Sequence, residues 1–196
     1  MTVLRLRPAD GPAETPTTDE FEGAALRARE DPAAFAEVYI AHRDQVHRFL
    51  QARCASDDDA LDLTAVTFER ALGAMGQYST RGGGIRAWLL RIARNAAVDH
   101  ARRRRLRDLV WRAATDESAP LEDQPETAIV RADERRYLHS LLAELSDTER
   151  DAIALRYGSE LTAREIGTVI GKSEEATQKL LSRALRRLKE TYRDDR

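Results

Sequence analysis

The chain has 196 residues, of which 42% are hydrophobic and 34% are charged, and its formal net charge is −2. This composition is typical of one globular domain or two small ones, and it excludes a wholly disordered chain. No apolar run approaches the roughly 20 residues of a membrane span, and the first residues lack the apolar core of a secretory signal. A single cysteine, Cys54, excludes an intrachain disulfide. We therefore expect a cytoplasmic protein.

Charge is segregated along the chain, so the small net value hides a basic segment. Residues 91–112 carry eight arginines and two aspartates, whereas residues 113–136 carry seven acidic residues and three arginines. A local concentration of guanidinium groups attracts polyanions whatever the overall charge. The basic segment is therefore a candidate for nucleic-acid binding.

The first predicted helix follows a tail. Residues 1–27 are rich in proline, threonine and acidic residues, which predicts disorder. Asp31 and Pro32 then predict a helix start, because aspartate caps free backbone amides and proline suits the first helical position. Apolar side chains recur at helical spacing from Phe35 to Phe49.

A second helix is expected between Ser56 and Gly76, with apolar positions at Leu61, Ala65, Phe68 and Leu72. Three consecutive glycines, Gly82–Gly84, then mark a loop with unusual backbone freedom. The segment Ala87–Arg105 follows as a long amphipathic helix. Its polar face carries Arg91, Arg94, Asn95, Arg102 and Arg105. Four consecutive arginines at 102–105 favour an anionic partner, and a solvated charged face is the alternative.

Residues 111–132 are acidic and contain two prolines, so we expect a linker there. Helices are predicted again from Tyr137 onward. Ser146 with Glu149, and Thr162 with Glu165, form two capping boxes that start further helices. No strand-length alternation occurs. The predicted fold is all-α, with small helical domains at 28–110 and 133–193.

The last part of the chain predicts a helix-turn-helix. A short helix with Ile166, Val169 and Ile170 ends at Gly171, and a longer basic helix begins after Ser173. In such a motif the first turns of the second helix face base edges in the major groove of DNA. A helical hairpin with a polar outer face is the alternative interpretation.

Taken together, the two halves resemble bacterial sigma factors of the extracytoplasmic-function (ECF) group. Residues 31–105 resemble region two through DPAAFAEVY, DDDALDLTAVTFERAL and AWLLRIARNAAVDHARRRR. Residues 135–192 resemble region four through LAELSDTERDAIALRY, LTAREIGTVIGKS and LLSRALRRL. The resemblance implies a protein that binds core RNA polymerase, recognises the −35 and −10 promoter elements and helps to open the DNA. We expect no enzyme activity, cofactor, metal or small-molecule substrate.

The resemblance also implies a docking surface for the β′ subunit of the polymerase on the acidic second helix. The residues that match it are Asp62, Leu63, Thr67 and Phe68. The family usually has glutamine and an acidic residue where this chain has Ala65 and Val66. A further expected partner is an anti-sigma factor, which would silence the protein or hold it at the membrane.

On the −10 side, the resemblance implies that the loop Tyr78–Arg86 receives an unpaired base, which needs a snug pocket. The positions that match the −10 DNA contacts are Gly83, Arg86, Trp88, Arg91, Asn95, Asp99, Arg102 and Arg103. Core packing is the alternative role for Trp88. A local cap or an ion pair with an arginine is the alternative role for Asp99.

On the −35 side, the family often has Ser-x-Gly-Thr-Val-Lys-Ser-Arg where this chain has SEEATQKL at 173–180. The expected contacts are Lys172, Ser173, Glu174, Thr177, Gln178, Lys179 and Arg183. Glutamine recognises adenine and glutamate accepts from cytosine, so we expect an unusual −35 preference. Glu174 and Glu175 also suit the positive end of a helix dipole.

Three alternative functions are consistent with parts of the sequence. A helix-turn-helix transcription regulator would need a sensing domain of alternating strands and helices, which the sequence does not predict. An enzyme such as a nuclease would need metal ligands, but the aspartates at 57–62 lack a nearby histidine or glutamate, and a helix start explains them. A degenerate sigma-like binding protein would fit the departures at Ala65, Gln178 and Leu180.

Overall fold

The structure is a computed structural model that describes residues 18–54, 56–114, 137–138 and 140–194. These residues form helices and connections without a strand, which confirms the predicted all-α class. The α-helices are α1 (Thr18–Arg27), α2 (Phe35–Gln51), α3 (Asp57–Ala74), α4 (Gly84–Ala114), α6 (Asp147–Tyr157), α7 (Ala163–Ile170) and α8 (Glu174–Asp194). Short 3-10 turns occur at Pro32–Ala34, Met75–Gln77 and Thr80–Gly82. Within the described ranges, no helix is both long enough and apolar enough to cross a membrane.

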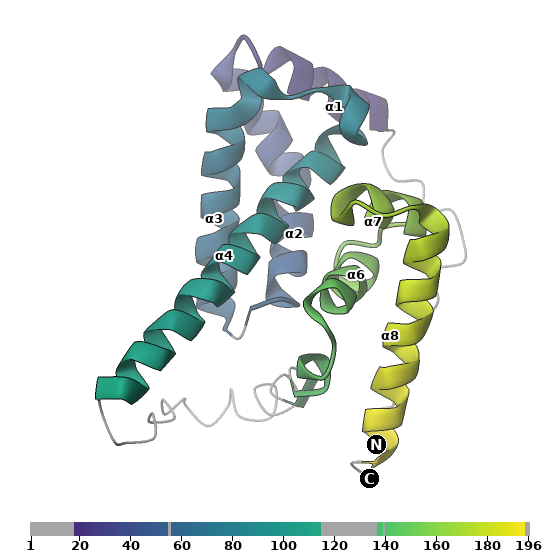
Figure 1. Ribbon diagram of the computed structural model, residues 1–196. Helices are drawn as coiled ribbons and strands as arrows, with labels where there is room; N and C mark the ends of the chain where they lie inside the picture. The colour runs from purple at the N-terminus through teal and green to yellow at the C-terminus, as the bar shows by residue number, and fades with distance from the viewer. Residues whose placement is uncertain (1–17, 55, 115–136, 139, 195–196) are drawn as a thin grey trace, which may run out of the picture.

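Helices α2, α3 and α4 pack side by side, and α1 lies across one end of this bundle (Figure 1). The predicted helix starts at Asp31 and Ser56 are confirmed, but Asp31 caps the 3-10 turn Pro32–Ala34 that leads into α2, and α2 itself begins at Phe35. Asp31 Oδ1 accepts a hydrogen bond from the Ala33 amide at 2.9 Å, and Ser56 Oγ accepts one from the Asp59 amide at 3.1 Å. Both caps satisfy backbone groups that a helix terminus leaves unpaired.

Helix α1 corrects the prediction that residues 1–27 form a disordered tail. Residues Thr18–Arg27 are helical. The side chains that anchor this segment are small: Ala24, Ala25 and Ala28 are all buried. Phe21 adds an edge-on contact with His42, with the ring centroids 5.3 Å apart. The sequence hid this helix because its anchoring face consists mainly of alanines in a polar context.

The buried face of α3 also differs from the predicted one. Phe68 is buried, but Leu61, Ala65 and Leu72 are exposed. The buried positions are Ala60, Leu63, Thr64, Thr67, Phe68 and Ala71. Thr64 and Thr67 each donate the hydroxyl to the carbonyl four residues earlier, so they pack as small side chains without an unpaired polar group. The apolar pattern alone missed this face because two of its members are threonines.

The glycine loop turns the chain into α4. Gly83 and Gly84 have φ values of +90° and +77°, in a region that glycine adopts without steric cost. Helix α4 then continues to Ala114, beyond the expected domain boundary at residue 110. The first half of α4 buries one face, which consists of Ile85, Leu89, Leu90, Ala93, Ala96 and Ala97.

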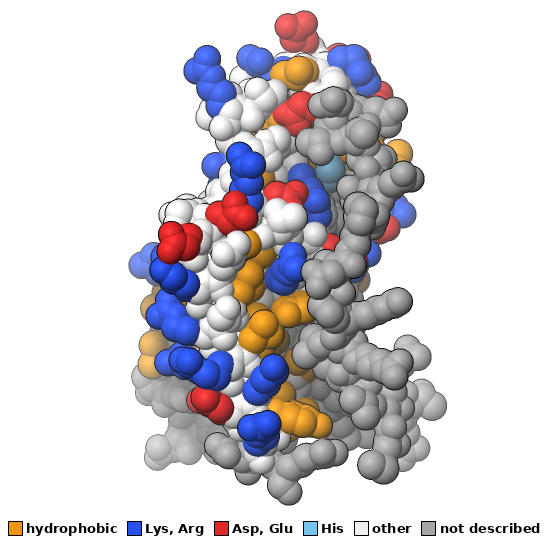
Figure 2. Space-filling model, turned by 90° about the vertical axis from the view of Figure 1, so that its right-hand side faces the viewer, with side chains coloured by type: hydrophobic (Ala, Val, Ile, Leu, Met, Phe, Trp, Pro, Cys, Tyr) orange, Lys and Arg blue, Asp and Glu red, His pale blue; other side chains and the backbone are white. Residues whose placement is uncertain are grey.

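In the C-terminal half, both predicted capping boxes are confirmed. Ser146 with Glu149 starts α6, and Thr162 with Glu165 starts α7. Gly171 ends α7 with a φ of +72°. Helix α7, this turn and α8 form the predicted helix-turn-helix. Helix α8 forms one outer side of the molecule, along which Lys and Arg side chains gather (Figure 2).

The structure places the two halves in contact. Gln45 Nε2 on α2 donates to the Ser159 carbonyl at 2.8 Å, and Arg48 Nε donates to the Gly158 carbonyl at 3.1 Å. One apolar core spans both halves, and a smaller cluster joins α6 and α8. The predicted linker at 111–132 lies, from residue 115 onward, outside the described residues.

Candidate nucleic-acid interface

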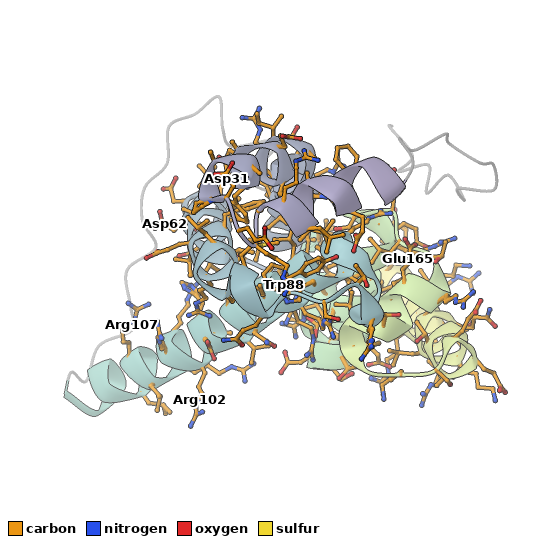
Figure 3. All side chains as sticks on the ribbon, turned by 90° about the horizontal axis from the view of Figure 1, so that it is seen from above. Asp31, Asp62, Trp88, Arg102, Arg107 and Glu165 are labelled. Atoms are coloured by element: carbon orange, nitrogen blue, oxygen red, sulfur yellow. The ribbon has the colours of Figure 1, made fainter. Side chains whose placement is uncertain are left out.

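The second half of α4 presents a dense set of exposed arginines. Residues 102–105 are all exposed. Arg102 and Arg107 point outward in different directions from the projecting end of the helix (Figure 3). Arg104 Nη1 lies 3.9 Å from Asp59 Oδ2, a solvated pair that holds the side chain only weakly. Exposed guanidinium groups of this kind bind phosphates without recognising sequence.

An open hollow of about 540 Å³ lies where the glycine loop meets α4. Its lining residues are Gln77, Ser79, Arg81, Gly82, Trp88, Arg91, Ile92 and Asn95. Trp88, Arg91 and Asn95, which were predicted to face the −10 DNA, thus come together around one space. An indole and a guanidinium offer stacking planes, and an amide offers one donor group and one acceptor. This combination suits an unpaired nucleobase.

The loop itself orients the arginine of this hollow. Arg91 Nη2 donates to the Gly82 carbonyl at 3.1 Å. A Cβ at Gly82 would lie 2.5 Å from the same nitrogen, so a side chain there would displace the guanidinium. Trp88 is half-buried and packs edge-on against Tyr78, with the ring centroids 5.3 Å apart. Trp88 therefore packs against the core and lines the hollow at once.

Two of the predicted −10 residues contact the C-terminal half. Arg86 Nη2 donates to the Ser159 carbonyl at 2.6 Å, and its Nη1 lies 3.2 Å from Glu165 Oε1. A Cβ built at Gly83 would lie 2.5 Å from Thr168 Cγ2, so α7 limits the approach to this glycine. In this arrangement Arg86 is occupied by protein groups.

A buried carboxylate joins the two halves more deeply. The Asp151 side chain on α6 is fully buried, and its Oδ2 lies 2.5 Å from Arg94 Nε on α4. Arg53 Nε, just after α2, lies 2.8 Å from Oδ1 without hydrogen-bond alignment. Removing one member of such a cluster leaves a buried charge unpaired, which is strongly destabilising. Nothing in the sequence marks these three residues as partners, because they are far apart in the chain.

The remaining −10 positions are exposed. Asn95 is exposed at the rim of the hollow. Asp99 Oδ2 lies 3.3 Å from Arg70 Nη1, and both side chains are largely exposed. This pair agrees with the local ion-pair role for Asp99, and at the surface it contributes little stability.

The candidate polymerase-docking helix α3 lies on the side of the molecule away from the C-terminal half (Figures 1 and 3). Asp62 is exposed there. The other three predicted docking residues, Leu63, Thr67 and Phe68, are buried in the core. In this structure only Asp62 of the four is accessible to a partner, and direct contact by the other three stays a prediction. They support the helix from beneath, and its outer surface consists of Leu61, Asp62, Ala65, Glu69 and Leu72.

Helix α8 presents most of its predicted −35 residues to solvent. The exposed ones are Lys172, Ser173, Glu174, Gln178, Lys179 and Arg183. The contacts with the N-terminal half run mainly through α6 and α7. Lys179 Nζ lies 2.7 Å from Glu175 Oε1, an exposed pair that extends along the helix surface.

Thr177 is the exception on α8. Its side chain is fully buried, and its Oγ1 donates to the Ser173 carbonyl at 2.9 Å. A Cβ at Gly167 would lie 3.1 Å from this hydroxyl, so Thr177 packs α8 against α7. Its burial leaves no accessible side chain for the predicted DNA contact in this structure. Leu180, at a position where the family usually has arginine, is buried as well and belongs to the core.

The buried titratable side chains of Cys54 and His42, in the described part of the chain, have strongly shifted pKa values. No group of three or more His, Cys, Asp or Glu side chains there is arranged to hold a metal ion. Burial raises the pKa of the Cys54 thiol to about 11, which keeps it protonated and unreactive. Burial lowers the pKa of His42 to about 4, so it packs beneath α1 as a neutral ring.

Two family profiles match the chain in the order of its halves. Sigma-70 region 2 matches residues 38–107, and sigma-70 region 4 matches residues 141–190. Curated relatives include the ECF RNA polymerase sigma factor BldN of Streptomyces coelicolor, which is 32% identical over 162 residues. That alignment covers 83% of this chain and 61% of BldN. The ECF sigma factor SigM of Bacillus subtilis is 27% identical over 161 residues, covering 80% of this chain and 93% of SigM.

Solved structures share the fold. CnrH, in complex with the cytosolic domain of CnrY, has a TM-score of 0.69 at 21% identity, covering 92% of this chain and 100% of that chain. The sigma factor RpoE of Bartonella quintana, in complex with the anti-sigma factor NepR, has a TM-score of 0.62 at 23% identity. That match covers 83% of this chain and 98% of RpoE.

Proposed function

This chain belongs to the ECF group of bacterial RNA polymerase sigma factors, and we propose that it binds core RNA polymerase, recognises the −35 and −10 promoter elements and promotes DNA melting. The observation that supports the proposal is that one chain presents two separate surfaces whose side chains suit DNA. One is an open hollow beside the basic helix α4, and the other is the exposed start of α8. Such a protein supplies recognition and strand separation, whereas the polymerase supplies the chemistry.

On the −10 side, Arg102 and Arg103 would bind phosphates, and the hollow of Trp88, Arg91 and Asn95 would take the unpaired base. Flipping a base costs a few kcal/mol, and stacking with hydrogen bonding in a pocket compensates for this cost. A site that binds only the unpaired base stabilises open DNA relative to closed DNA. Binding would therefore drive melting without a chemical step.

On the −35 side, α8 would lie in the major groove. Glu174 and Gln178 would face base edges, because both are exposed on the first turns of the helix. Lys172, Lys179 and Arg183 would hold phosphates. The exposed glutamine favours an adenine contact, since its amide matches the adenine edge.

The two expected protein partners would bind at different places: the polymerase on α3, away from the DNA surfaces, and an anti-sigma factor over them. The exposed side of α3 around Asp62 would contact the β′ subunit of the polymerase, and the β subunit is the second expected partner within the core enzyme. An anti-sigma factor would silence the protein by covering either DNA surface. If the anti-sigma factor is attached to a membrane, the inactive complex would be held there.

Full use of the −10 surface, including Gly83 and Arg86, would require the two halves to separate. Arg86 is occupied by Ser159 and Glu165, and Arg94 is occupied by Asp151. We infer that the closed arrangement is the resting form of the chain. Polymerase and promoter DNA would shift the population towards an open form by binding that form better.

In vitro transcription with the cognate core polymerase and a randomised promoter library tests the proposal. We expect initiation from promoters that share one −35 and one −10 sequence, and none with core enzyme alone. Folded protein that binds core enzyme but initiates from no selected promoter would favour the degenerate sigma-like protein. Sequence-specific duplex binding without any requirement for core enzyme would favour a helix-turn-helix regulator.

A further inference from the structure

One carboxylate on α1, that of Glu22, accepts hydrogen bonds from both ends of the glycine loop. Glu22 accepts a hydrogen bond from the Tyr78 hydroxyl at the start of the loop. Its other oxygen, Oε2, accepts one from the Ile85 amide at 3.1 Å, just past the end of the loop. Residues 79–84 therefore run between two anchor points that converge on a single side chain.

The two anchor points satisfy different needs. The Ile85 amide is one of the first in α4 and has no partner within its own helix, so Glu22 caps α4 from outside. The Tyr78 ring is 2% exposed and packs against Trp88. Burial and the bond to Glu22 raise the pKa of the Tyr78 hydroxyl, which therefore remains a donor. In both hydrogen bonds, therefore, the loop group is the donor and the Glu22 carboxylate is the acceptor.

The loop between the anchors is rich in glycine, the residue with the greatest backbone freedom. It contains Gly82, Gly83 and Gly84, and the last two have positive φ values. This same loop provides Ser79, Arg81 and Gly82 to the hollow. The Gly82 carbonyl also orients Arg91. The shape of the hollow therefore depends on how the loop is held from outside.

Helix α1 is held firmly enough to do this. Ala24 and Ala25 are buried against the bundle, and Phe21 packs on His42. Arg27 Nη2 lies 2.7 Å from Glu37 Oε2 on α2. The buried alanines and the Phe21 contact flank Glu22 and hold its carboxylate in place, whereas the exposed Arg27–Glu37 pair adds little.

We propose that Glu22 is a positioning residue for promoter opening, because it preorganises the hollow that receives the unpaired −10 base. Glu22 does not line the hollow itself and acts through Tyr78 and the start of α4. Preorganisation reduces the entropy lost when a flexible loop orders on binding. The inference rests on the proposed function of the hollow and adds α1 to the machinery that opens DNA.

The test uses the full chain bound to core polymerase on a selected promoter that carries 2-aminopurine at successive −10 positions. Fluorescence then reports base unpairing. Glu22→Ala should lower the equilibrium for opening by roughly ten- to a hundredfold, the range for a lost hydrogen bond to a charged group. Glu22→Gln keeps one carbonyl acceptor and should lose less. Affinity for core polymerase and for −35 duplex should stay at the wild-type value. Glu30→Gln, an exposed carboxylate near α1, is the matched control.

A double-mutant comparison separates positioning from general packing. Tyr78→Phe should impair opening alone but add nothing to Glu22→Ala, because the hydroxyl has then already lost its acceptor. Thermal unfolding is measured for every variant. If Glu22→Ala does not fold, Glu22→Gln and Tyr78→Phe decide the matter. Wild-type opening by the folded Glu22 and Tyr78 variants, or a parallel loss of core affinity, would overturn the inference. A wild-type protein that opens no promoter would instead overturn the proposed function.

Discussion

The two helices that we propose to recognise DNA, α4 and α8, differ in what covers them. The first turns of α8 are exposed, and the contacts between the halves run mainly through α6 and α7. The first turns of α4 face the C-terminal half, where Arg86 and Arg94 bind Ser159, Glu165 and Asp151. Under the proposed function, recognition of the −35 element would need docking alone, whereas recognition of the −10 element would also need a rearrangement around Arg86.

The C-terminal half covers only the beginning of α4. The arginines at 102–105 remain exposed, so the closed form already offers a phosphate-binding surface. The covered part contains Gly83 and Arg86, next to the hollow that would take a base. Closure thus limits base recognition more than it limits non-specific attraction to DNA.

The largest effect should follow from Asp151→Ala, which removes the buried carboxylate that lies between Arg53 and Arg94. Breaking a buried ion pair from one side costs about 3–5 kcal/mol, so thermal unfolding should shift strongly. Small-angle scattering should show a larger radius of gyration in the folded fraction. Asp147→Ala on the same helix is the control, because that carboxylate is largely exposed and lies 3.9 Å from Arg53. If the two substitutions changed thermal stability and radius of gyration equally, Asp151 would not be the residue that holds the two halves together.

Acid should weaken the N-terminal half through His42. Its pKa is about 4 in the folded protein against 6.5 in an unfolded chain, so the unfolded state takes up a proton first as the pH falls. The stability is fully present above pH 6.5 and is lost towards pH 4, by about 3 kcal/mol in total. Urea unfolding at several pH values should show this slope, and His42→Leu should flatten it. An unchanged slope in His42→Leu would place the acid sensitivity elsewhere.

On the exposed side, Gln178→Ala should change the −35 preference. Loss of a bidentate contact to a base costs about 1–3 kcal/mol at one base pair and little at the others. Binding to a set of single-base −35 variants measures this directly. A uniform loss across all variants would mean that Gln178 does not recognise a base.

The smallest effect for each residue should come from the exposed arginines of α4. Arg102→Ala with Arg103→Ala should weaken −10 DNA binding by about 0.2–1 kcal/mol for each lost ion pair, whatever the sequence. The slope of log affinity against log salt should fall by about two, since two phosphate contacts are lost. Arg43→Ala on α2 is the control, because Arg43 is exposed beside Asp44. A sequence-dependent loss would instead assign base recognition to these arginines.

Local features of this fold were predictable, and the contacts that close it were not. The caps at Ser56, Ser146 and Thr162 follow from neighbouring residues, and all three form as predicted. The burial of Thr177 depends on how α7 approaches α8, which no local pattern contains. The buried faces of α1 and α3 escaped prediction because alanines and threonines carry little apolar signal.

The same division applies to the candidate site. Trp88, Arg91 and Asn95 were predicted from the sequence, and they meet around one hollow. Glu22 and Asp151 were not predicted, although one holds the loop of that hollow and the other holds the closed form. Each acts through a partner distant in the chain, and only the folded structure brings such pairs together.

The most direct test of the account measures both DNA elements on the free chain. A labelled −35 duplex and a labelled −10 single strand are titrated with wild-type protein and with Asp151→Asn. The account predicts equal −35 affinity for both proteins and −10 affinity higher by about tenfold or more in the variant, because the open form gains population. Equal −10 affinity of the two folded proteins would contradict the claim that the C-terminal half covers the −10 surface.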